Sequence, residues 1–158
     1  MKRVSNDSTM DATMRNKILA LLASHRKMTI ATLRPDGWPQ ATTVGYGNDG
    51  LRIYFLCGTD SQKAANLAHD SRVSLTIDDD TAQVMAIEGL SMAARAELVT
   101  DPVEAGRALQ LMMLRYPPQA VAIPMPRAED VRIFRLRPTV ISVLDYTRGF
   151  GHTDLVSC

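Results

Sequence analysis

The chain passes from a strand into a helix at Cys57-Gly58-Thr59-Asp60-Ser61-Gln62-Lys63-Ala64-Ala65-Asn66-Leu67. Residues 51–56, just before this stretch, are mostly aromatic or branched apolar residues, which is typical of a half-buried strand. Thr59 or Asp60 can serve as the N-cap of the helix that follows. Ser61, Gln62 and Lys63 then lie in the first turn, among free backbone N–H groups at the positive end of the helix dipole. The stretch predicts an anion site to which Lys63 adds a full charge, with a capped surface helix and a solvated lysine as the alternative.

The patterns on either side of this stretch predict a mainly β fold with flanking helices. An apolar face at Met14, Ile18, Leu21 and Leu22 predicts a first helix that ends near Ser24. Asp101-Pro102-Val103-Glu104 predicts the start of a third helix, with an Asp cap and a Glu placed for a capping box. Strands are predicted at residues 28–33, 38–47, 51–57, 72–77, 84–100, 131–136 and 139–146. Short strands in this order, mostly joined as hairpins, favour an antiparallel barrel over a parallel α/β sheet.

Length, charge and composition limit the classes of protein. A chain of 158 residues fits one domain, and its net charge of +1 gives no general field for nucleic acid or an anionic membrane. The N-terminal residues lack the apolar core of a signal peptide, and no run approaches the roughly 20 apolar residues of a membrane span. Two cysteines are too few for a disulfide framework, and the absence of zinc spacing predicts no metal site. We expect a reduced, soluble, cytoplasmic protein.

The domain organisation follows from where the periodic patterns begin and end. We expect a flexible N-terminus at residues 1–11, one domain at 12–147, and a C-terminal tail without periodic structure at 148–158.

Gly45-Tyr46-Gly47-Asn48-Asp49-Gly50 matches the G-x-G-x-x-G dinucleotide fingerprint letter for letter. That fingerprint needs a helix after it, so that the helix N-terminus meets the pyrophosphate. Residues 51–56 alternate as a strand instead, and Asn48-Asp49-Gly50 is typical of a hairpin turn. We therefore reject a dinucleotide site here.

The histidines and Cys57 offer few catalytic groups. His25 and His69 each end a predicted helix, where an imidazole can meet free carbonyls, and Cys57 is interpreted as a small buried hydrophobe. His152 lies in the aperiodic segment 146–152, together with Arg148. Both side chains can bind an anion, so His152 is the candidate catalytic residue, and a loose tail is the alternative.

The order of these motifs resembles the pyridoxamine phosphate oxidase-like family of FMN-binding split barrels. The resemblance covers about residues 14–147 and is most specific at 29–32, 36–40, Lys63, Asn66-Leu67 and Ser71-Arg72-Val73. It implies a six- to seven-stranded antiparallel split barrel with three helices, and makes 12–147 an FMN-binding domain. It also implies a homodimer with two equivalent sites at the subunit interface and a flavin across the second and third strands.

The resemblance also implies which residues bind the cofactor. Lys63 matches the phosphate-binding lysine, with Ser61 and Gln62 beside it. Thr42, Thr43 and Val44 would lie along the ring, and Phe55, Leu56 and Cys57 beneath it. Gly58 and Thr59 would lead toward the phosphate. The second subunit would contribute Tyr146, Arg148 and His152. Many members carry an arginine where this chain has Ser61, so Arg52, Arg72 or Arg148 would have to replace its charge.

The leading functional hypothesis is an FMN-binding homodimeric oxidoreductase that acts on an unidentified small molecule. Pyridoxamine phosphate is not assigned as the substrate, because no basic set for its phosphate is found. The alternative is a non-catalytic module, a carrier or sensor that binds flavin, deazaflavin or haem. Haem would require His152 or another histidine as an iron ligand.

Overall fold

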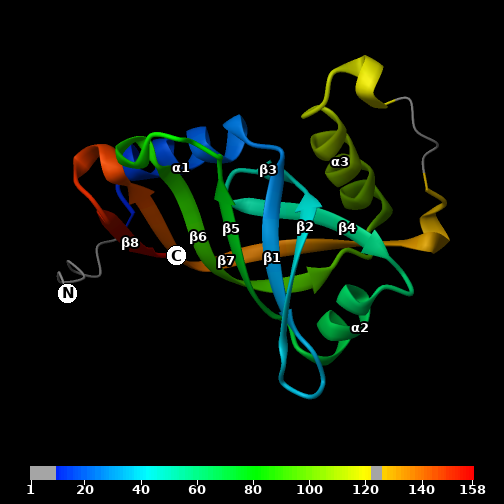
Figure 1. Cartoon of the computed structure of the whole chain (residues 1–158). Helices are drawn as coiled ribbons and strands as arrows, with labels where there is room; N and C mark the ends of the chain where they lie inside the picture. Colours follow the sequence, from blue (N-terminus) through cyan, green and yellow to red (C-terminus); the bar gives the residue numbers. More distant parts are fainter. Residues whose placement is uncertain (1–9, 122–125) are drawn as a thin grey trace.

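Figure 1 shows the computed structural model, which describes residues 10–121 and 126–158. Within these residues, eight strands form one antiparallel sheet in the order β2-β1-β5-β6-β7-β4-β3, with β8 paired to β7. The sheet curls into a half-barrel, and β2 and β3 lie at its two free ends. The mainly β, antiparallel fold with three helices confirms the predicted fold class. The elements are α1 (Ala12–Ser24), β1 (Lys27–Leu33), β2 (Pro39–Gly45), β3 (Gly47–Asp49), β4 (Arg52–Gly58), α2 (Gln62–His69), β5 (Arg72–Asp78), η1 (Val84–Ala86), β6 (Glu88–Leu98), α3 (Pro102–Met113), η2 (Pro118–Val121), η3 (Ala128–Asp130), β7 (Val131–Asp145), η4 (Tyr146–Arg148) and β8 (Thr153–Ser157).

The core fills the inside of the curled sheet. Residues along β5 are alternately exposed and buried. Helix α1 closes one end of the half-barrel with Ile18 and Leu22, which are both fully buried. Phe55 of β4 stacks on Phe134 of β7, with ring centroids 5.5 Å apart. Each such apolar side chain contributes roughly 1.5–3 kcal/mol when fully buried. The period-two pattern of the sequence therefore places the core correctly.

The chain crosses from one free end of the sheet to the other at Tyr46. The sequence predicts one strand over 38–47 and a turn at 48–50, but β2 ends at Gly45 and pairs only with β1. β3 pairs with β4 instead, at the opposite end of the sheet. The predicted strand is therefore wrong in its last residues, and Asn48 and Asp49 belong to a strand. No helix follows Gly50, which confirms that the glycine motif is not a dinucleotide site.

Tyr46 makes this crossing because its polar groups bind the end of α1. Its N–H donates to the Arg26 carbonyl at 3.2 Å, and its hydroxyl donates to the Leu22 carbonyl at 2.6 Å. Burial raises the pKa of the Tyr46 hydroxyl to about 12. The Arg115 guanidinium lies 4.8 Å from the ring centroid and also donates to the carbonyls of Leu22 and His25. The corner therefore also supplies partners for carbonyls at the end of α1 that the helix leaves free.

Three other segments differ from their predictions. Residues 84–86 form a 3₁₀ turn, so the long predicted strand begins only at Glu88. The two last predicted strands are one strand, β7, because Pro138 sits where the register with β6 shifts at Ala93/Ala94 and its missing N–H is tolerated. The aperiodic tail is wrong, because 153–157 form β8 on β7; only Val156 of this strand is buried, so no alternation signals it. Of the predicted flexible N-terminus, residues 1–9 lie outside the described residues.

The start of α3 is confirmed, but its acid has another role. Asp101 is the N-cap and accepts from the Val103 N–H at 3.1 Å. Glu104 forms no capping box, since it accepts from Arg135 at 2.6 Å and from the Tyr54 hydroxyl at 2.8 Å. The Arg135 guanidinium lowers the pKa of the Glu104 carboxyl. This contact fixes α3 on the outer side of β4 and β7.

Gly47 sets how closely α3 approaches β3. A Cβ on Gly47 would lie 2.7 Å from the Met112 backbone nitrogen, which cannot move without shifting the helix. We predict that Gly47→Ala destabilises the protein by about 1–3 kcal/mol, because the helix is forced away from the strand. Gly106, inside α3, has open space around it, so Gly106→Ala should be neutral or stabilise by up to about 1 kcal/mol. Chemical denaturation of both variants tests this, and equal stability of the two would contradict the packing.

Candidate functional site

The first turn of α2 lies against β2. Ser61 is the N-cap, in place of the predicted Thr59 or Asp60, and its hydroxyl accepts from the Ala64 N–H at 3.2 Å. The Lys63 ammonium donates to the Thr42 hydroxyl of β2 at 3.1 Å. In the described part of the chain Lys63 has no carboxylate partner, and the amides of Gln62 and Lys63 meet no acceptor. The turn therefore presents the charge of half-buried Lys63 and two free backbone N–H groups, which are the donors that an anion can bind.

A polar network holds α2 in this position. Asn66 is fully buried, and its amide donates to the Thr32 hydroxyl at 2.9 Å and to the Gln40 side-chain oxygen at 3.2 Å. Gln62 in turn donates to the Asn66 oxygen at 2.8 Å. The network joins one turn of α2 to β1 and β2, so it fixes Lys63 relative to Thr42. Sequence reasoning assigned Asn66, Thr32 and Gln40 no role, and an amide inside an otherwise apolar helix face was the signal.

The predicted residues of β2 divide between the two faces of the sheet. Thr42 and Val44 are half-buried on the inner face, where Val44 packs against the core. Thr43 is exposed on the outer face, opposite Thr29. β2 is also an end strand, so one row of its N–H and C=O groups has no partner strand within the described sheet. A planar ligand beside β2 can therefore meet backbone groups as well as the Thr42 hydroxyl.

The predicted residues at the end of β4 are less accessible. Phe55 and Cys57 are buried in the core, so Cys57 is the small buried hydrophobe that its sequence context indicates. Half-buried Leu56 packs with the cluster under α3. Thr59 holds the segment just before β7, since its N–H donates to the Asp130 carbonyl and its hydroxyl to the Glu129 carbonyl. Exposed Gly58 leads into the turn at Ser61, and its carbonyl accepts from the Ser61 N–H at 3.0 Å.

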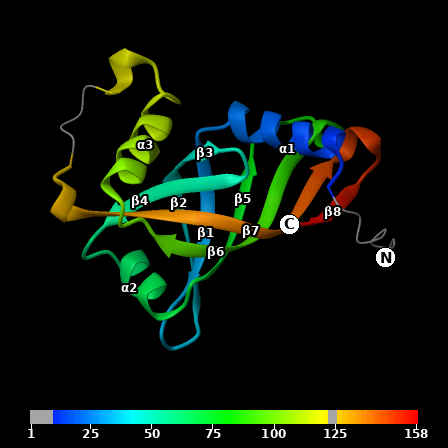
Figure 2. The same ribbon diagram turned by 180° about the vertical axis from the view of Figure 1, so that it is seen from behind.

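The C-terminal candidates lie at the other end of the molecule from α2. Figures 1 and 2 both place η4 and β8 beside α1, far from α2. His152 Nε2 lies 3.1 Å from Asp154 Oδ2, and Arg148 donates to the same oxygen at 3.2 Å. Buried Asp145 anchors the segment through Lys17, and this contact lowers the pKa of the Asp145 carboxyl. Tyr146, Arg148 and His152 therefore form an ordered loop that the single chain does not bring to Lys63.

The expected substitutes for the missing arginine are engaged elsewhere. Arg72 pairs with Asp70 at 2.7 Å and lowers the pKa of that carboxyl, and Arg52 lies at the far end of β4 from the α2 turn. Exposed Arg132 is directly opposite Cys57 on β7, beside the end of β4. It forms no ion pair within the described residues. Arg132, which the sequence did not single out, is thus a cation without an ion pair in the described residues, beside the end of β4 that leads to the α2 turn.

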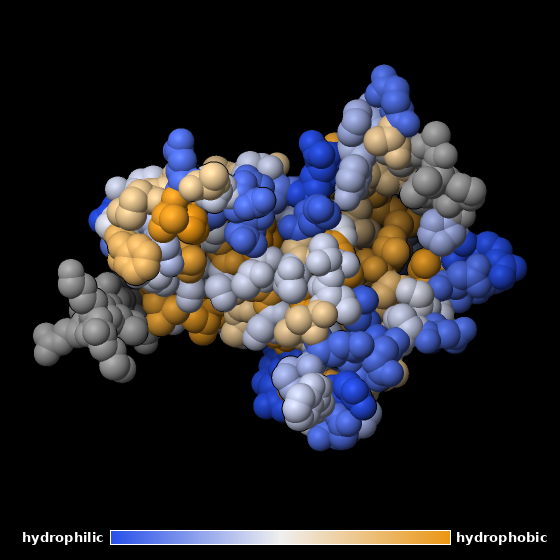
Figure 3. All heavy atoms as spheres, in the orientation of Figure 1, coloured by the Kyte–Doolittle hydropathy of each residue, from blue (hydrophilic) through white to orange (hydrophobic). Residues whose placement is uncertain are grey.

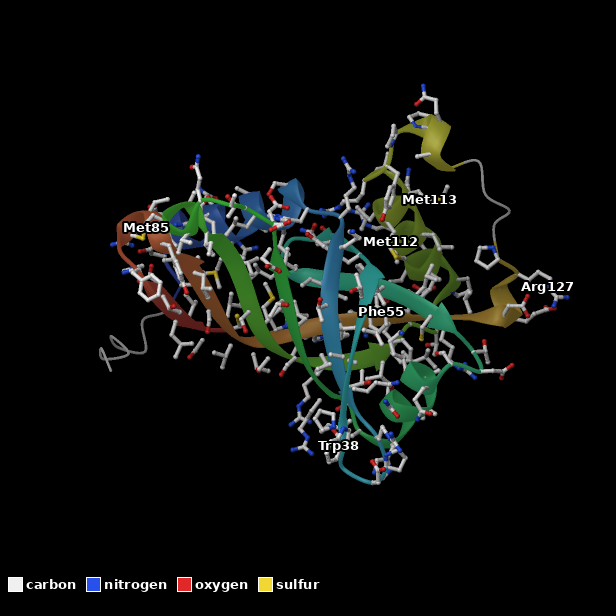
Figure 4. All side chains as sticks on the ribbon, viewed as in Figure 1. Trp38, Phe55, Met85, Met112, Met113 and Arg127 are labelled. Carbon is white, nitrogen blue, oxygen red and sulfur yellow. The ribbon has the colours of Figure 1, made fainter. Side chains whose placement is uncertain are left out.

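His25 is a local cap, as predicted, because its Nδ1 lies 2.7 Å from the Leu21 carbonyl oxygen. His69 is the last residue of α2, but within the described residues its side chain has no hydrogen bond to a helix carbonyl. Trp38 is 71% exposed at the tip of the β1–β2 hairpin, away from the core (Figure 4).

Comparison with known proteins identifies the family. The chain matches the pyridoxamine 5'-phosphate oxidase family over residues 14–145. The chain belongs to this family. No curated protein sequence matches it significantly.

Solved structures share the fold of this pyridoxamine 5'-phosphate oxidase family member. A conserved hypothetical protein from Mycobacterium tuberculosis is 25% identical, with 93% of this chain and 92% of that one covered and a TM-score of 0.74. A haem-binding protein from Mycobacterium smegmatis is 24% identical, with a TM-score of 0.73; 95% of this chain covers 59% of that one. A haem storage protein from Vibrio cholerae is 20% identical, with 78% and 88% covered and a TM-score of 0.64. Similarity at these levels shows a shared fold.

None of the helices in residues 10–121 and 126–158 is long and apolar enough to cross a bilayer.

We predict that Asn66→Ala loosens the anion site and the fold together. The change leaves the buried Thr32 hydroxyl without its partner, which should cost about 1–3 kcal/mol of the free energy of unfolding. Gln62→Ala is the matched control, because exposed Gln62 bonds only to Asn66 and should cost less than about 1 kcal/mol. Urea denaturation of both variants measures this, and an Asn66→Ala protein as stable as the control would contradict the network.

Proposed function

We propose that this protein binds FMN and acts as an oxidoreductase on a small molecule. The observation that carries the proposal is the position of half-buried Lys63, whose ammonium donates to the Thr42 hydroxyl. In the described residues it has no carboxylate partner, and the backbone N–H groups of Gln62 and Lys63 beside it have no acceptor. Such a turn fits a phosphate monoester, because charge-assisted N–H···O⁻ bonds are the strong ones and the helix dipole favours a negative charge. The family match supports the same cofactor class.

The residues of the chain would bind and orient the cofactor. Lys63 and the amides of Gln62 and Lys63 would hold the phosphate, with Arg132 as the candidate second cation in place of the missing arginine. The unpaired edge of β2 would donate and accept along the ring. A bound flavin supplies the hydride and electron chemistry, so the protein need not contain a catalytic acid–base pair.

The proposal also includes the cellular compartment and the substrate of the protein. Free Cys57 and Cys158 fit a reducing, cytoplasmic compartment. The substrate is an unidentified small molecule that would lie over the exposed face of the ring. His152, oriented by Asp154, is the candidate proton donor or acceptor if a second copy brings it there.

A second candidate function is haem binding without turnover, as a carrier or sensor. It is favoured by His152, whose ring nitrogen is fixed by Asp154, the arrangement that commonly orients an iron-ligating imidazole. Structural relatives described as haem-binding and haem storage proteins support it. Deazaflavin would use the same Lys63 site as FMN.

The two functions differ in their spectra. We expect purified protein to take up FMN with a flavin spectrum that bleaches anaerobically with one nicotinamide reductant. A Soret band that is lost in His152→Ala, with no flavin uptake, would favour haem. Flavin that no reductant or acceptor changes would favour a non-catalytic module.

We predict that Lys63→Ala weakens FMN binding by about tenfold to 150-fold, since it removes a charge-assisted contact worth roughly 1.5–3 kcal/mol. Riboflavin, which lacks the phosphate, should bind wild-type protein less tightly than FMN does. The affinity for riboflavin should be the same in the Lys63→Ala variant as in wild type. Lys27→Ala removes a lysine from an exposed position on β1 and is the matched control. Fluorescence titration measures the affinities of all three proteins for FMN and for riboflavin. Equal affinity of wild-type protein for FMN and riboflavin would show that the phosphate site is misassigned.

A further inference from the structure

The end of α1 and the end of β5 meet at a hollow of about 480 Å³. β5 begins at Arg72, shortly after α2, so the hollow lies at the opposite end of β5 from the Lys63 turn. Figure 3 shows strongly hydrophilic residues gathered in this part of the surface, over the end of α1 and the end of β5. The walls of the hollow include His25, Arg26, Lys27, Asp78, Asp79 and Tyr116.

The ring of His25 is held in one orientation and one tautomer. Only 8% of the residue is exposed, and its Nδ1 lies 2.7 Å from the Leu21 carbonyl oxygen. A carbonyl oxygen can only accept, so Nδ1 carries a hydrogen. The Ser24 hydroxyl also donates to this oxygen, and Arg115 donates to the His25 backbone carbonyl at 2.7 Å. In the neutral ring, Nε2 is therefore an acceptor in a fixed position.

The Nε2 atom of His25 has no donor as a partner. It is buried and forms no hydrogen bond within the described residues, although Asp79 Oδ2 lies 3.2 Å away. A neutral Nε2 and a carboxylate oxygen both accept, so they repel at this distance unless a positive charge lies between them. A proton on Nε2 would draw the two atoms to about 2.7–2.9 Å, the usual length of a charge-assisted bond. The observed separation is longer, which leaves room for a larger cation.

His152 and Asp154 form a similar pair in a different environment. Their Nε2 and Oδ2 atoms lie 3.1 Å apart, but this contact is a hydrogen bond, and Arg148 donates to the same oxygen. His152 Nδ1 has no partner within the described residues, so the hydrogen of the neutral ring can be on Nε2. Of the two pairs, only that of His25 therefore sets an acceptor against an acceptor.

We propose that a divalent transition-metal ion of the Zn²⁺ class binds between His25 Nε2 and Asp79 Oδ2. Imidazole nitrogen and carboxylate oxygen bind zinc at about 2.0–2.2 Å, and tetrahedral ligands at that distance lie roughly 3.3 Å apart. The observed 3.2 Å fits this geometry. The Nδ1–H of His25 donates to a backbone carbonyl, as the outer nitrogen of a metal-bound histidine usually does. The two ligands come from different elements, which is why the sequence, with no zinc spacing, predicts no metal site.

The metal would keep open coordination positions. Within residues 10–121 and 126–158 no three His, Cys, Asp or Glu side chains are placed to share one ion, so water completes the coordination. Asp78 adds a negative charge to the same hollow and forms no ion pair among the described residues, whereas exposed Arg26 and Lys27 oppose a cation. We therefore expect weaker binding than at a four-ligand structural zinc centre.

The site is tested with Zn²⁺ alone. In equilibrium dialysis of the EDTA-treated full chain against Zn²⁺, we expect a single bound ion per chain. Asp79→Asn should weaken this binding at least tenfold, because an amide oxygen carries no charge; Asp79 is exposed, and circular dichroism checks the fold. Asp80→Asn removes the same charge one residue further on, outside the hollow, and should bind zinc as wild type does. No binding by wild type, or equal binding by Asp79→Asn, would overturn the proposal.

Thermal unfolding distinguishes a metal from a proton. The ends of α1 and β5 meet only in the folded chain, so zinc bound to both should raise the melting temperature of wild type and of Asp80→Asn, but not of Asp79→Asn or His25→Gln. His25→Gln changes a buried group, so its melting temperature with zinc is compared with its own value without metal. An equal rise in all four proteins would place the zinc elsewhere. No rise in wild type, together with a lower melting temperature in Asp79→Asn, would show that a protonated His25 pairs with Asp79. Either result would overturn the metal site.

The metal site goes beyond the proposed function and does not depend on it. Asp79→Asn should bind FMN as wild type does, because the hollow and the Lys63 turn lie at opposite ends of β5. FMN titration of the same samples therefore separates the two proposals. Zinc binding without flavin binding would remove the proposed function alone, and flavin binding without zinc binding would remove this inference alone.

Discussion

The crossing of the chain at Tyr46 determines the form of this half-barrel. The strand that begins at Pro39 stops at Gly45, and Gly47–Asp49, one residue further on, pair with β4 at the opposite end of the sheet. Tyr46 is fully buried and hydrogen-bonded to the end of α1, and Gly47 is in tight contact with α3. Because the backbone cannot serve both neighbours, β2 and β3 remain free ends. The split in the barrel is therefore a consequence of one corner, closed by α1 on one side and α3 on the other.

The open edge of β2 is what a ligand can use. Thr42 lies on this strand, and α2 places Lys63 against it. The position of α2 depends in turn on Asn66, whose buried amide is bonded to β1, β2 and the first turn of the same helix. A buried amide with all its partners fixes geometry more strictly than apolar contacts do. Two constraints, the corner and the amide network, thus bring a positive charge and unpaired backbone groups to the same place.

Local sequence patterns were sufficient to predict most helices and strands, but not the places where a strand breaks or continues unexpectedly. Alternation found the core face of β5, and Asp101-Pro102 found the start of α3, because both signals act within a few residues. The break at Tyr46 depends on the Leu22 carbonyl, 24 residues earlier in α1, and the continuity through Pro138 depends on a bulge against β6. β8 has one buried residue, so it has no periodic signal.

The site shows the same division. The family resemblance assigns Lys63 and Thr42 to one cofactor site, and the structure places their side chains 3.1 Å apart. Ser61 was missed as the N-cap because Thr59 and Asp60, just before it, can serve the same role, although its bond to the Ala64 N–H is local. The network of Asn66 was missed because its partners on β1 and β2 come close only in the assembled sheet. Phe55 and Cys57 were assigned to the cofactor by the family resemblance, from their place on the strand, yet their side chains face the core. Position along a strand predicts proximity to a ligand better than it predicts which face is used.

The central claim is that a flavin phosphate occupies the first turn of α2 beside the edge of β2. A crystal structure of the protein with bound FMN tests it most directly. The account predicts phosphate oxygens within hydrogen-bond distance of Lys63 Nζ and the Gln62 and Lys63 amides, with the ring along β2. A phosphate bound elsewhere, with Lys63 still bonded only to Thr42, would contradict it.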